Sequence, residues 1–272
     1  MVENAKSISE VTSLLQKSIT PLGRREEISL CSANGRICAE HIYSPLSLPT
    51  SNNAAVDGFA FHYEWSTSHP NHVYDIVAEI RAGHPYSGKL LPGQAVAIFT
   101  GAIVPEELNC IVMQENCILE EKKRVRIPFA PKKGLNIRMA GENLRKGEVI
   151  IKDGQRISAA DIGQLSAIGR SKIFCYSELS IGVLSTGDEV MDASNTKAFL
   201  RPGQLYDTNR PMLKAMITKD NHFCSDYGII IDDKTSLQEG YEKALSENNI
   251  VISTGGASQG IEDHTQEVLA SL

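Results

Sequence analysis

The feature that most constrains the fold of this chain is a strict alternation of strand-like and helix-like segments over residues 179–272. Apolar runs and amphipathic stretches follow one another in the order 179–185, 211–220, 223–231, 236–247 and 249–254. Strand and helix in regular succession predict a parallel, doubly wound sheet with helices on both faces. A further helical pattern begins at 263–272, where the sequence ends. We therefore expect this sheet to be incomplete, with the strand at 249–254 partly uncovered.

Residues 1–178 have a different pattern, in which helical segments flank a β-rich insert. Ser7 and Glu10 have the spacing of a helix-capping box, and apolar residues at helical spacing follow as far as Ile19. A second apolar pattern over 28–42 predicts another helix. A later helical pattern at 158–169 begins with Ser158 as its expected cap.

The insert between these helical segments contains short β-like runs separated by Gly and Pro turns. The runs occupy residues 73–80, 94–99, 110–115 and 124–127. They predict a small antiparallel β domain. Because helical stretches flank the insert, we expect them to pack together as one discontinuous unit.

The predicted fold class is therefore a multidomain α/β plus β chain, with a small β domain inserted in a helical or extended N-terminal unit. An incomplete doubly wound parallel-sheet domain follows. The expected divisions are a helical part of a linker and dimer domain at 1–49, the inserted β domain at 50–137, a return segment at 138–178, and the doubly wound domain at 179–272.

Composition and charge exclude several classes of function. The formal net charge is −6 and no basic, aromatic-interleaved stripe occurs, which argues against a nucleic-acid surface. No basic leader with an apolar core and no run of about 18 apolar residues is present, so we expect a cytoplasmic protein without membrane segments. Six scattered cysteines and seven unpaired histidines indicate neither a zinc site nor His-centred nucleophilic catalysis.

Three apolar runs end in Thr-Gly, at Thr100, Thr186 and Thr254. Ligands of open α/β sheets bind at the carboxyl ends of strands, where glycine lets the backbone approach and free N–H groups face an anion. The loop GGASQG, which contains Gly255, Gly256 and Ser258, could form an amide nest for a phosphate or similar oxyanion. It lacks the pattern of a P-loop. The alternative is a tight turn with no ligand.

Acidic residues gather at the same predicted strand ends. They are Asp188, Glu189, Asp207, Asp232, Asp233 and Asp263. Hard oxygen ligands of this kind suit Mg²⁺, which usually combines one or two carboxylates with a ligand phosphate. Helix N-caps are the alternative for Asp207 and Asp232. The pair Asp188 and Glu189, directly after an apolar strand and a glycine, is harder to explain as caps.

One loop, PTSNNAAVDGFA at residues 49–60, has neither strand nor helix periodicity. It presents a single carboxylate, Asp57, beside Gly58. A turn-forming Asp-Gly pair is the simpler interpretation, and a functional carboxylate is the alternative that we favour.

Taken together, these motifs resemble the MoeA-type molybdopterin molybdotransferase family, which is related to the C-terminal domain of gephyrin. The similar stretches are NNAAVDGFA, AIFTGAIVP, GENLRKGE, LSTGDEV, PGQLYDTNRPML, GIIIDD and STGGASQGIED, in the order of the family and over nearly the whole chain. The resemblance implies that the doubly wound domain is of the MoaB/Mog type. It also implies a transferase that uses molybdate as substrate and Mg²⁺ as cofactor to convert adenylylated molybdopterin into molybdenum cofactor, with release of AMP.

The resemblance also assigns roles to residues and partners. It implies a homodimer, built mainly from residues 1–178, in which the β insert of one subunit faces the doubly wound domain of the other, and contact with the molybdopterin adenylyltransferase. The catalytic residues would be Asp57, Thr100 and Glu189, with Asp57 and Glu189 binding Mg²⁺. The substrate-binding residues would be Asp188, Asp232, Asp233, Gly255, Gly256, Ser258 and Asp263.

The sequence departs from the family in its loops and in its length. Asn52, Ala54 and Asn143 stand where the family usually has Asp, Ser and Asp. Family members continue beyond the position of Leu272 with further lysines, strands and a β domain, so we expect a C-terminally truncated chain that is a poor catalyst. The rival hypothesis is a non-catalytic dimeric scaffold or pterin-nucleotide-binding homologue. A sugar-phosphate or nucleotide enzyme that shares only the α/β part is disfavoured by the matching N-terminal loop and β insert.

Overall fold

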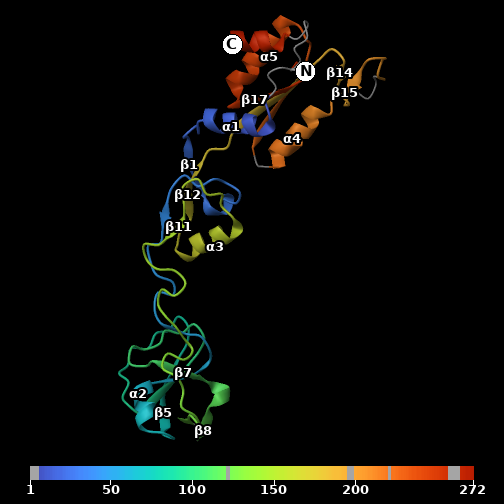
Figure 1. Ribbon diagram of the computed structural model, residues 1–272. Helices are drawn as coiled ribbons and strands as arrows, with labels where there is room; N and C mark the ends of the chain where they lie inside the picture. The colour runs from blue at the N-terminus through green and yellow to red at the C-terminus, as the bar shows by residue number, and fades with distance from the viewer. Residues whose placement is uncertain (1–5, 121–122, 195–198, 220–221, 257–263) are drawn as a thin grey trace. The chain divides into compact units, whose positions relative to one another are not determined.

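The computed structural model describes residues 6–120, 123–194, 199–219, 222–256 and 264–272. The chain forms two compact units, each described here by itself (Figure 1). Unit 1 contains Met1–Glu40, Asp153–Ser166 and Arg170–Leu272, and unit 2 contains His41–Lys152 and Ala167–Gly169. Unit 2 thus contains the β-rich insert together with residues 41–49, 138–152 and 167–169 of the flanking segments, and the other parts of these segments lie in unit 1 with the C-terminal α/β part.

Unit 2 is built on a six-stranded sheet with the strand order β7-β4-β6-β5-β9-β8. Its strands are β4 (Gly58–Phe61), β5 (Val73–Ile80), β6 (Gln94–Ile98), β7 (Cys110–Met113), β8 (Ile118–Glu120) and β9 (Arg124–Arg126). The four runs predicted from the sequence are therefore strands. The expectation of an antiparallel domain was wrong at one position, because β5 and β6 pair in parallel while the other neighbours are antiparallel.

Apolar side chains form two clusters in unit 2. One contains Ile80, Val96 and Ile111, and the other contains Phe61, Tyr74, Val112 and Val125. The short helix α2 (Tyr63–Ser68) and the 3-10 turn η2 (Gln114–Asn116) connect strands of this sheet. Two further antiparallel pairs complete unit 2, between β2 (Ile42–Tyr43) and β11 (Val149–Ile151) and between β3 (Asn53–Ala54) and β10 (Ile137–Arg138).

The N-terminal and return segments meet in unit 1 through strands, not through helices. Strand β1 (Arg25–Ser29) pairs antiparallel with β12 (Lys172–Tyr176). The helix predicted over 28–42 was wrong, because this stretch contains only the 3-10 turn η1 (Leu30–Ser32) and isolated bridges. Gly35 has a positive φ of 81°, which a helix cannot accommodate. The apolar residues there, such as Cys38, are buried beside β12.

Two helices of this part of unit 1 agree with the sequence pattern. Helix α1 (Ile8–Ser18) has the capping box between Ser7 and Glu10, but none of its residues is buried. Helix α3 (Ala159–Ala167) begins after Ser158. The Ser158 hydroxyl accepts from the Asp161 amide at 3.3 Å, and the Ser158 amide donates to the Asp161 carboxylate at 2.8 Å.

The C-terminal part of unit 1 is a three-layer α/β arrangement. Its sheet has the order β16-β13-β17, with both pairs parallel. The elements are β13 (Ser180–Thr186), β14 (Val190–Met191), β15 (Leu205–Tyr206), α4 (Asn209–Lys219), β16 (Phe223–Ile230), α5 (Lys234–Glu247), β17 (Ile250–Thr254) and α6 (Thr265–Ser271). The predicted strand and helix succession is confirmed.

Helices cover both faces of this sheet, as the pattern predicted. Leu184 of β13 packs with Leu237 and Tyr241 of α5 and with Val268 of α6. Ile181 and Val183 point to the opposite face and pack with Ile217 of α4. Within the described residues β17 is an edge strand, and Ile250 is 42% exposed. In the part of the chain that the structure describes, no helix is both long and apolar enough to cross a membrane.

Candidate functional site

Asp57 and Thr100 lie together in unit 2. The backbone amide of Thr100 donates to Asp57 Oδ1 at 2.8 Å, and the Thr100 hydroxyl donates to the same oxygen at 2.7 Å. Both residues are exposed. These two donors, the backbone amide first and the hydroxyl second, hold the pKa of the Asp57 carboxyl below its usual range. The loop at 49–60 therefore presents an ionised and oriented carboxylate.

The sheet of unit 2 fixes this arrangement. Asp57 directly precedes β4, and Thr100 lies two residues beyond β6, which is paired with β4. Gly58 allows the loop to enter the sheet, because a Cβ at this position would lie 2.0 Å from the carbonyl oxygen of Val112 in β7. Gly101 has a φ of 82° and continues the turn after Thr100.

A second group of predicted residues gathers in unit 1, where the three parallel strands end. The carboxylate of Asp188, two residues beyond β13, accepts from the backbone amide of Asp232, two residues beyond β16, at 3.3 Å. Gly255 follows β17, and a Cβ on it would lie 2.1 Å from the carbonyl oxygen of Thr186. The loops that follow β13, β16 and β17 therefore meet at one edge of the sheet, as expected for a ligand site in an open α/β sheet.

Glu189 lies at the same edge. Its carboxylate folds back over Gly187, so that a Cβ on Gly187 would lie 2.8 Å from Glu189 Oε2. Among the described residues, no hydrogen bond or ion pair involves the exposed Glu189 carboxylate. No described Arg or Lys therefore forms an ion pair with Glu189 that would explain this residue by a purely structural role.

The hydroxyl of Thr186 is also notable at this edge. Thr186 is 1% exposed, and its Oγ1 has no hydrogen-bond partner among the described residues. A buried hydroxyl without a partner is costly. The methyl carbon of the same residue lies beside Gly255 and Gly256, because Cβ atoms added to these glycines would come within 3.2 Å of it. The glycine loop thus starts beside a residue with this unsatisfied hydroxyl.

The remaining predicted residues have other surroundings. Asp233 is the N-cap of α5 and accepts from the amides of Thr235 and Ser236 at 3.1 and 3.0 Å. Its carboxyl pKa is lowered, chiefly by Ser236. The cap of α5 is therefore Asp233 and not its neighbour Asp232. Ser258 and Asp263 lie outside the described residues.

Asp207 has a role that the sequence analysis only partly foresaw. It is 7% exposed and accepts from the Arg210 amide at 3.1 Å, which is a cap-like bond at the start of α4. The same carboxylate accepts from the Ser185 hydroxyl at 2.6 Å and from Arg210 Nε at 2.9 Å. Asp207 therefore belongs to a partly buried charged cluster that is bonded to the end of β13.

The carboxylates at the strand ends are oxygen ligands of the kind that Mg²⁺ takes. The described residues contain no group of three or more His, Cys, Asp or Glu side chains arranged to hold a metal ion. Mg²⁺ prefers oxygen ligands and commonly takes only one or two carboxylates, with water and a ligand phosphate completing its shell. Asp188, Glu189 and Asp232 supply such oxygens, whereas a dedicated all-protein cage is absent among these residues.

Sequence reasoning missed several residues near the two groups. Asn209 Nδ2 donates to Thr254 Oγ1 at 2.8 Å, next to the glycine loop. The guanidinium of Arg81 lies 5.4 Å from the ring centroid of Phe99, beside Thr100. Asn209 lies in the stretch PGQLYDTNRPML, but its role could not be seen from the sequence. Arg81 follows the strand β5 and belongs to no motif, so the sequence carried no signal for Arg81.

The substituted loop positions of unit 2 also have defined partners. The side chain of Asn52 accepts from the Ala140 amide at 2.9 Å, and Asn143 Oδ1 accepts from Arg138 Nη2 at 3.0 Å. Arg138 also pairs with Glu142 at 2.8 Å. Asn52 and Asn143 therefore keep the hydrogen bonds that an Asp could make, without its charge.

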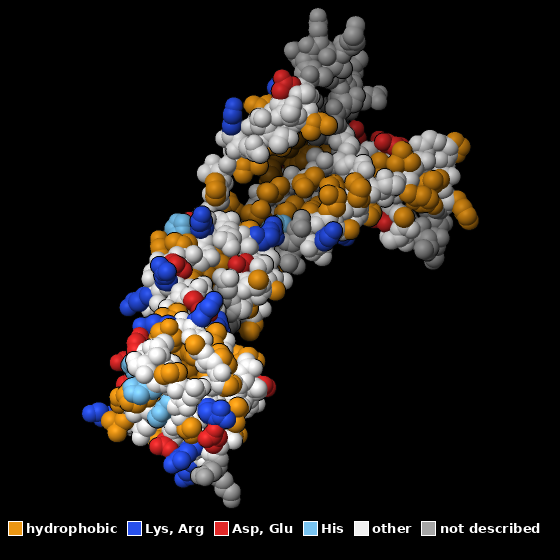
Figure 2. All heavy atoms as spheres, turned by 60° about the horizontal axis from the view of Figure 1, so that its bottom comes forward, with side chains coloured by type: hydrophobic (Ala, Val, Ile, Leu, Met, Phe, Trp, Pro, Cys, Tyr) orange, Lys and Arg blue, Asp and Glu red, His pale blue; other side chains and the backbone are white. Residues whose placement is uncertain are grey.

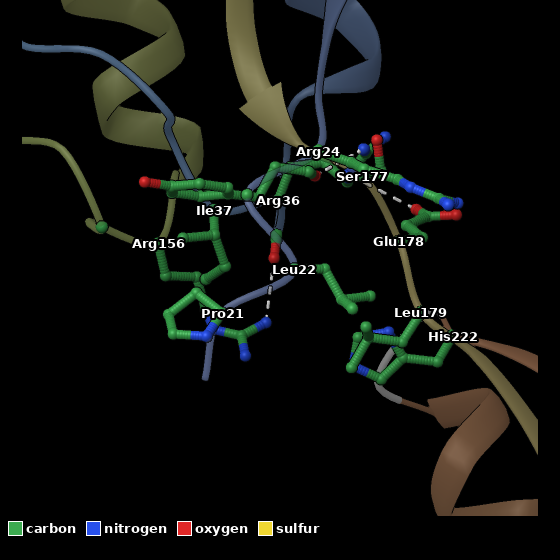
Figure 3. Close-up of a pocket in the computed structure, with 14 residues that line it drawn as sticks. Pro21, Leu22, Arg24, Arg36, Ile37, Arg156, Ser177, Glu178, Leu179 and His222 are labelled. Carbon is green, nitrogen blue, oxygen red and sulfur yellow. Dashed lines mark hydrogen bonds and ion pairs between the residues drawn. The ribbon is translucent and has the colours of Figure 1, made fainter. Parts of the chain in front are cut away.

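Unit 1 also contains a cavity of about 520 Å³ that does not include any predicted site residue. Pro21, Leu22 and Leu179 line it together with polar groups (Figure 3). In the same view Arg36 pairs with Glu178 at 3.5 Å, and Arg156 donates to the Gly35 carbonyl at 2.8 Å. The arginine side chains Arg36 and Arg156 of this cavity thus already bond other residues of the chain. We do not include this cavity in the candidate site.

Comparisons with known proteins agree with this division of the chain. Residues 6–169 match the family described as the MoeA N-terminal region (domain I and II), and residues 182–272 match the probable molybdopterin binding domain. A molybdopterin molybdenumtransferase of Haemophilus influenzae is 34% identical over 247 residues, covering 91% of this chain and 60% of that protein. One from Nostoc sp. is 36% identical over 250 residues, covering 91% and 56%.

A solved structure gives the same result for the fold. The molybdopterin biosynthesis MoeA protein of Pyrococcus horikoshii is similar with a TM-score of 0.83 and 29% identity, covering 99% of this chain and 67% of that one. The chain spans about 60% of the length of the curated relatives that it matches.

Proposed function

Because residues 6–169 match its N-terminal region, this chain belongs to the MoeA family, and we propose that it acts as a molybdopterin molybdotransferase in molybdenum cofactor biosynthesis. In this reaction molybdate is inserted into adenylylated molybdopterin and AMP is released. The observation that carries the proposal is the meeting of Asp188, Glu189, Asp232 and Gly255 at the carboxyl ends of three neighbouring parallel strands. This is where open α/β sheets bind ligands.

The strand-end group would bind the phosphate part of the substrate. Gly255 and Gly256 have φ values of 93° and 61°, which residues with a side chain rarely adopt. This backbone conformation lets their amides turn toward an anion. The methyl carbon of Thr186 packs beside them, and the buried hydroxyl of this residue has no partner among the described residues. Ser258 and Asp263 would extend the phosphate contact, and Asp188, Asp232 and Asp233 would line the acidic side of the site.

Magnesium would be held by Glu189 and by Asp57, each of which offers an exposed carboxylate. When bound, Mg²⁺ would offset the phosphate charge and polarise the bond whose cleavage releases AMP. Asp57 needs to be ionised for this role. An aspartate is ionised at neutral pH, and the two donors of Thr100, which lower the pKa of Asp57 further, fix the direction of its carboxylate.

A homodimer would bring the two groups of residues into one site. Asp57 and Thr100 belong to unit 2, and the strand-end residues belong to unit 1. Apolar side chains are exposed on the surface of unit 1 (Figure 2), and Ile8, Leu15 and Ile19 of the α1 region are 88%, 54% and 68% exposed. An obligate dimer of this kind should bury about 2,000 Å² or more. We place the protein in the cytoplasm and include the molybdopterin adenylyltransferase among its partners.

One observation favours a second function, that of a non-catalytic scaffold or pterin-nucleotide-binding homologue. Asn52 and Asn143 stand where the resemblance to the family implies carboxylates, and both are engaged in hydrogen bonds within unit 2. A site with fewer charges can still bind a nucleotide but has less to offer a cation.

The test is molybdate-dependent AMP release from adenylylated molybdopterin. The transferase hypothesis is supported if the parent chain releases AMP and Asp57→Asn releases it about 100-fold or more slowly, with the thermal midpoint of unfolding nearly unchanged. Binding of the substrate without AMP release supports the scaffold. Release that is unchanged by Asp57→Asn would show that this carboxylate is a turn residue. The same assay on a chain extended to the length of the family members tests the expectation of poor catalysis.

A further inference from the structure

A charged cluster around Arg210 lies behind the strand-end residues of unit 1. The Arg210 side chain is 7% exposed and bonds three carboxylates. Its Nε donates to Asp207 Oδ2 at 2.9 Å, its Nη1 contacts both oxygens of Asp226 at 2.7 Å, and its Nη2 donates to Asp192 Oδ2 at 2.5 Å. Lys214 also pairs with Asp226 at 2.5 Å. The planar fork of one guanidinium thus joins three separate segments.

These three segments include the one that carries Asp188 and Glu189. Asp192 lies three residues beyond Glu189, on the far side of β14. Its bond to Arg210 therefore holds the C-terminal side of the loop that begins at Gly187. Asp207, through its bond with the Ser185 hydroxyl, holds the end of β13 on the N-terminal side. Arg210 thus bonds the C-terminal side of this loop directly and its N-terminal side through Asp207, whereas the Glu189 side chain has no partner among the described residues.

The residue before Arg210 reaches the other loop of the site. Asn209 Nδ2 donates to Thr254 Oγ1 at 2.8 Å, immediately before Gly255. Two consecutive residues at the start of α4 are therefore bonded to the acidic loop and to the last residue of β17, which precedes the glycine loop. This gives a physical role to the DTNR stretch of the sequence, residues 207–210, which the proposed ligand contacts do not use.

Stability alone is a poor account of such a cluster. Three carboxylates face two cations, so the cluster carries a net charge of −1, and Arg210 and Asp207 are both buried. Burying charged groups costs solvation energy that their attraction often only balances, and apolar side chains in their place can be equally stable. The pairing of β14 with β15 fixes the middle of the loop through its backbone, and the bond from Arg210 to Asp192 adds a directional contact at its C-terminal side that an apolar side chain would not supply.

We propose that Arg210 is a positioning residue that holds the loop of residues 187–192 so that Asp188 and Glu189 face the glycine loop. The identity of the ligand rests on the proposed function, whereas the ordering of the loop does not. Partners that orient a ligating side chain typically contribute about 10- to 100-fold to affinity or activity when they are removed.

The first measurement is hydrogen exchange of the free protein, which needs no ligand. Asp192→Asn removes the charged bond to the loop but leaves Arg210 with Asp207 and Asp226, so this variant should stay folded. We expect faster exchange of the amides of residues 187–194 and unchanged exchange in β16 and α5. Arg210→Lys, which keeps the charge but cannot reach three carboxylates at once, should increase exchange of the same residues.

Two control variants separate positioning from general destabilisation. Lys214→Ala removes an exposed cation of the cluster and leaves the bonds of Arg210 in place. Leu213→Ala destabilises α4 through the apolar cluster that contains Ile217. Neither should accelerate exchange at 187–194 selectively. Unchanged exchange at these residues in Asp192→Asn, or an equal increase in Leu213→Ala, would overturn the proposal.

The second measurement is binding of AMP in the presence of Mg²⁺ by calorimetry, with AMP as the probe for the nucleotide part of the substrate. We expect Asp192→Asn to weaken binding about 10-fold and Arg210→Lys by up to about 100-fold, with Lys214→Ala unchanged. Equal affinity in all variants, despite faster exchange at 187–194, would also overturn the positioning role. If the parent protein does not bind AMP with Mg²⁺, the proposed nucleotide site fails, and hydrogen exchange alone decides whether Arg210 orders the loop.

Discussion

The two halves of the candidate site are held in place by different kinds of interaction. In unit 2, Asp57 directly precedes β4, which pairs with β6 on one side and β7 on the other, so a backbone ladder fixes the start of the loop. The carboxylate itself bonds a neutral amide and a neutral hydroxyl of Thr100. Substitution of a charged side chain elsewhere in unit 2 should therefore leave this half intact.

In unit 1 a charged cluster adds to the backbone bonds that hold the corresponding residues. Asp188 and Glu189 follow β13 in a loop whose two sides are bonded to Arg210 through Asp207 and Asp192. The backbone also holds this loop, because β14 pairs in parallel with β15 and the Leu205 amide donates to the Glu189 carbonyl oxygen at 2.9 Å. The comparison teaches that backbone pairing alone positions the carboxylate of unit 2, whereas the loop of unit 1 combines backbone pairing with side-chain charges. The two halves should therefore respond differently to charge removal, to acid and to added volume.

The largest effect is expected from Arg210→Gln. This change leaves Asp207, which has a side chain only 4% exposed, without its cation. Removing one partner of a buried ion pair typically costs about 3–5 kcal/mol in free energy of unfolding. Calorimetry should show a lower melting temperature for the transition of unit 1. A similar loss in the transition of unit 2 would contradict the separation of the two halves.

The same cluster should make this difference dependent on pH. Asp192, Asp207 and Asp226 all have lowered pKa values. Hydrogen bonds from Ser194 are the main cause for Asp192, and they lower its pKa to about 2. Desolvation raises the pKa of Asp207 and of Asp226, but hydrogen bonds outweigh it. These bonds come chiefly from Ser185 and Arg210 for Asp207, and from Lys214, the Gly228 amide and Arg210 for Asp226. Carboxylates with a lowered folded pKa contribute stability above their unfolded value near 3.8, and lose it as the pH falls through the folded value. The difference between the parent and Arg210→Gln should be largest near pH 7 and should shrink between about pH 4 and pH 2.

Gly58→Ala should produce the next largest effect, now in unit 2. The new Cβ would lie 2.0 Å from the Val112 carbonyl oxygen and 3.0 Å from the Met113 Cα, so the paired strands must move apart. Overpacking of this kind costs about 3 kcal/mol in free energy of unfolding. Gly163→Ala in α3 is the matched control, because nothing lies within 4 Å of its Cβ and alanine favours a helix. A melting temperature of Gly58→Ala equal to the parent would show that the sheet is not rigid here.

Gly255→Ala tests whether the loop of unit 1 yields more easily. Its Cβ would lie 2.1 Å from the Thr186 carbonyl oxygen at a φ of 93°, which is a clash as close as that of Gly58. The glycine, however, follows an edge strand of the described sheet and can shift, so we expect a cost of only about 1–2 kcal/mol from the strained φ. Hydrogen exchange should increase near β17 and remain unchanged in unit 2. A loss of stability equal to that of Gly58→Ala would remove this contrast between the two units.

The sequence predicted most of the α/β part of the fold because the physical signals there are local. Apolar runs of strand length and amphipathic stretches of helix length are sufficient to give β13, α4, β16, α5 and β17. The helix expected at 28–42 failed for a non-local reason. Its apolar residues are buried by pairing with β12, more than 130 positions away in the chain, and local periodicity does not record that pairing.

The site was predicted unevenly for the same reason. The bond between Asp57 and Thr100 joins residues 43 positions apart, so only the resemblance to a family placed both residues in one site. Arg210 was not singled out, because its partners Asp192 and Asp226 lie 18 and 16 positions away and no spacing rule connects them. The sequence also could not distinguish the adjacent carboxylates Asp232 and Asp233. The structure shows that Asp233 caps α5, whereas the backbone amide of Asp232 donates to the Asp188 carboxylate.

Thr100→Val should have the smallest effect on stability and a measurable effect on charge. The variant loses the hydroxyl donor to Asp57 but keeps the backbone amide, which is the larger cause of the lowered pKa. Because both residues are exposed and the loop is fixed by β4 and β6, the melting temperature should change by about 2 °C or less. The Asp57 pKa should rise toward its usual value, which carboxyl titration by NMR would record. Thr100→Ser, which keeps the hydroxyl, is the control and should leave the pKa low. A large drop in melting temperature would mean that side-chain bonds, and not the sheet, hold this half of the site, while an unchanged pKa would mean that the hydroxyl does not orient the carboxylate.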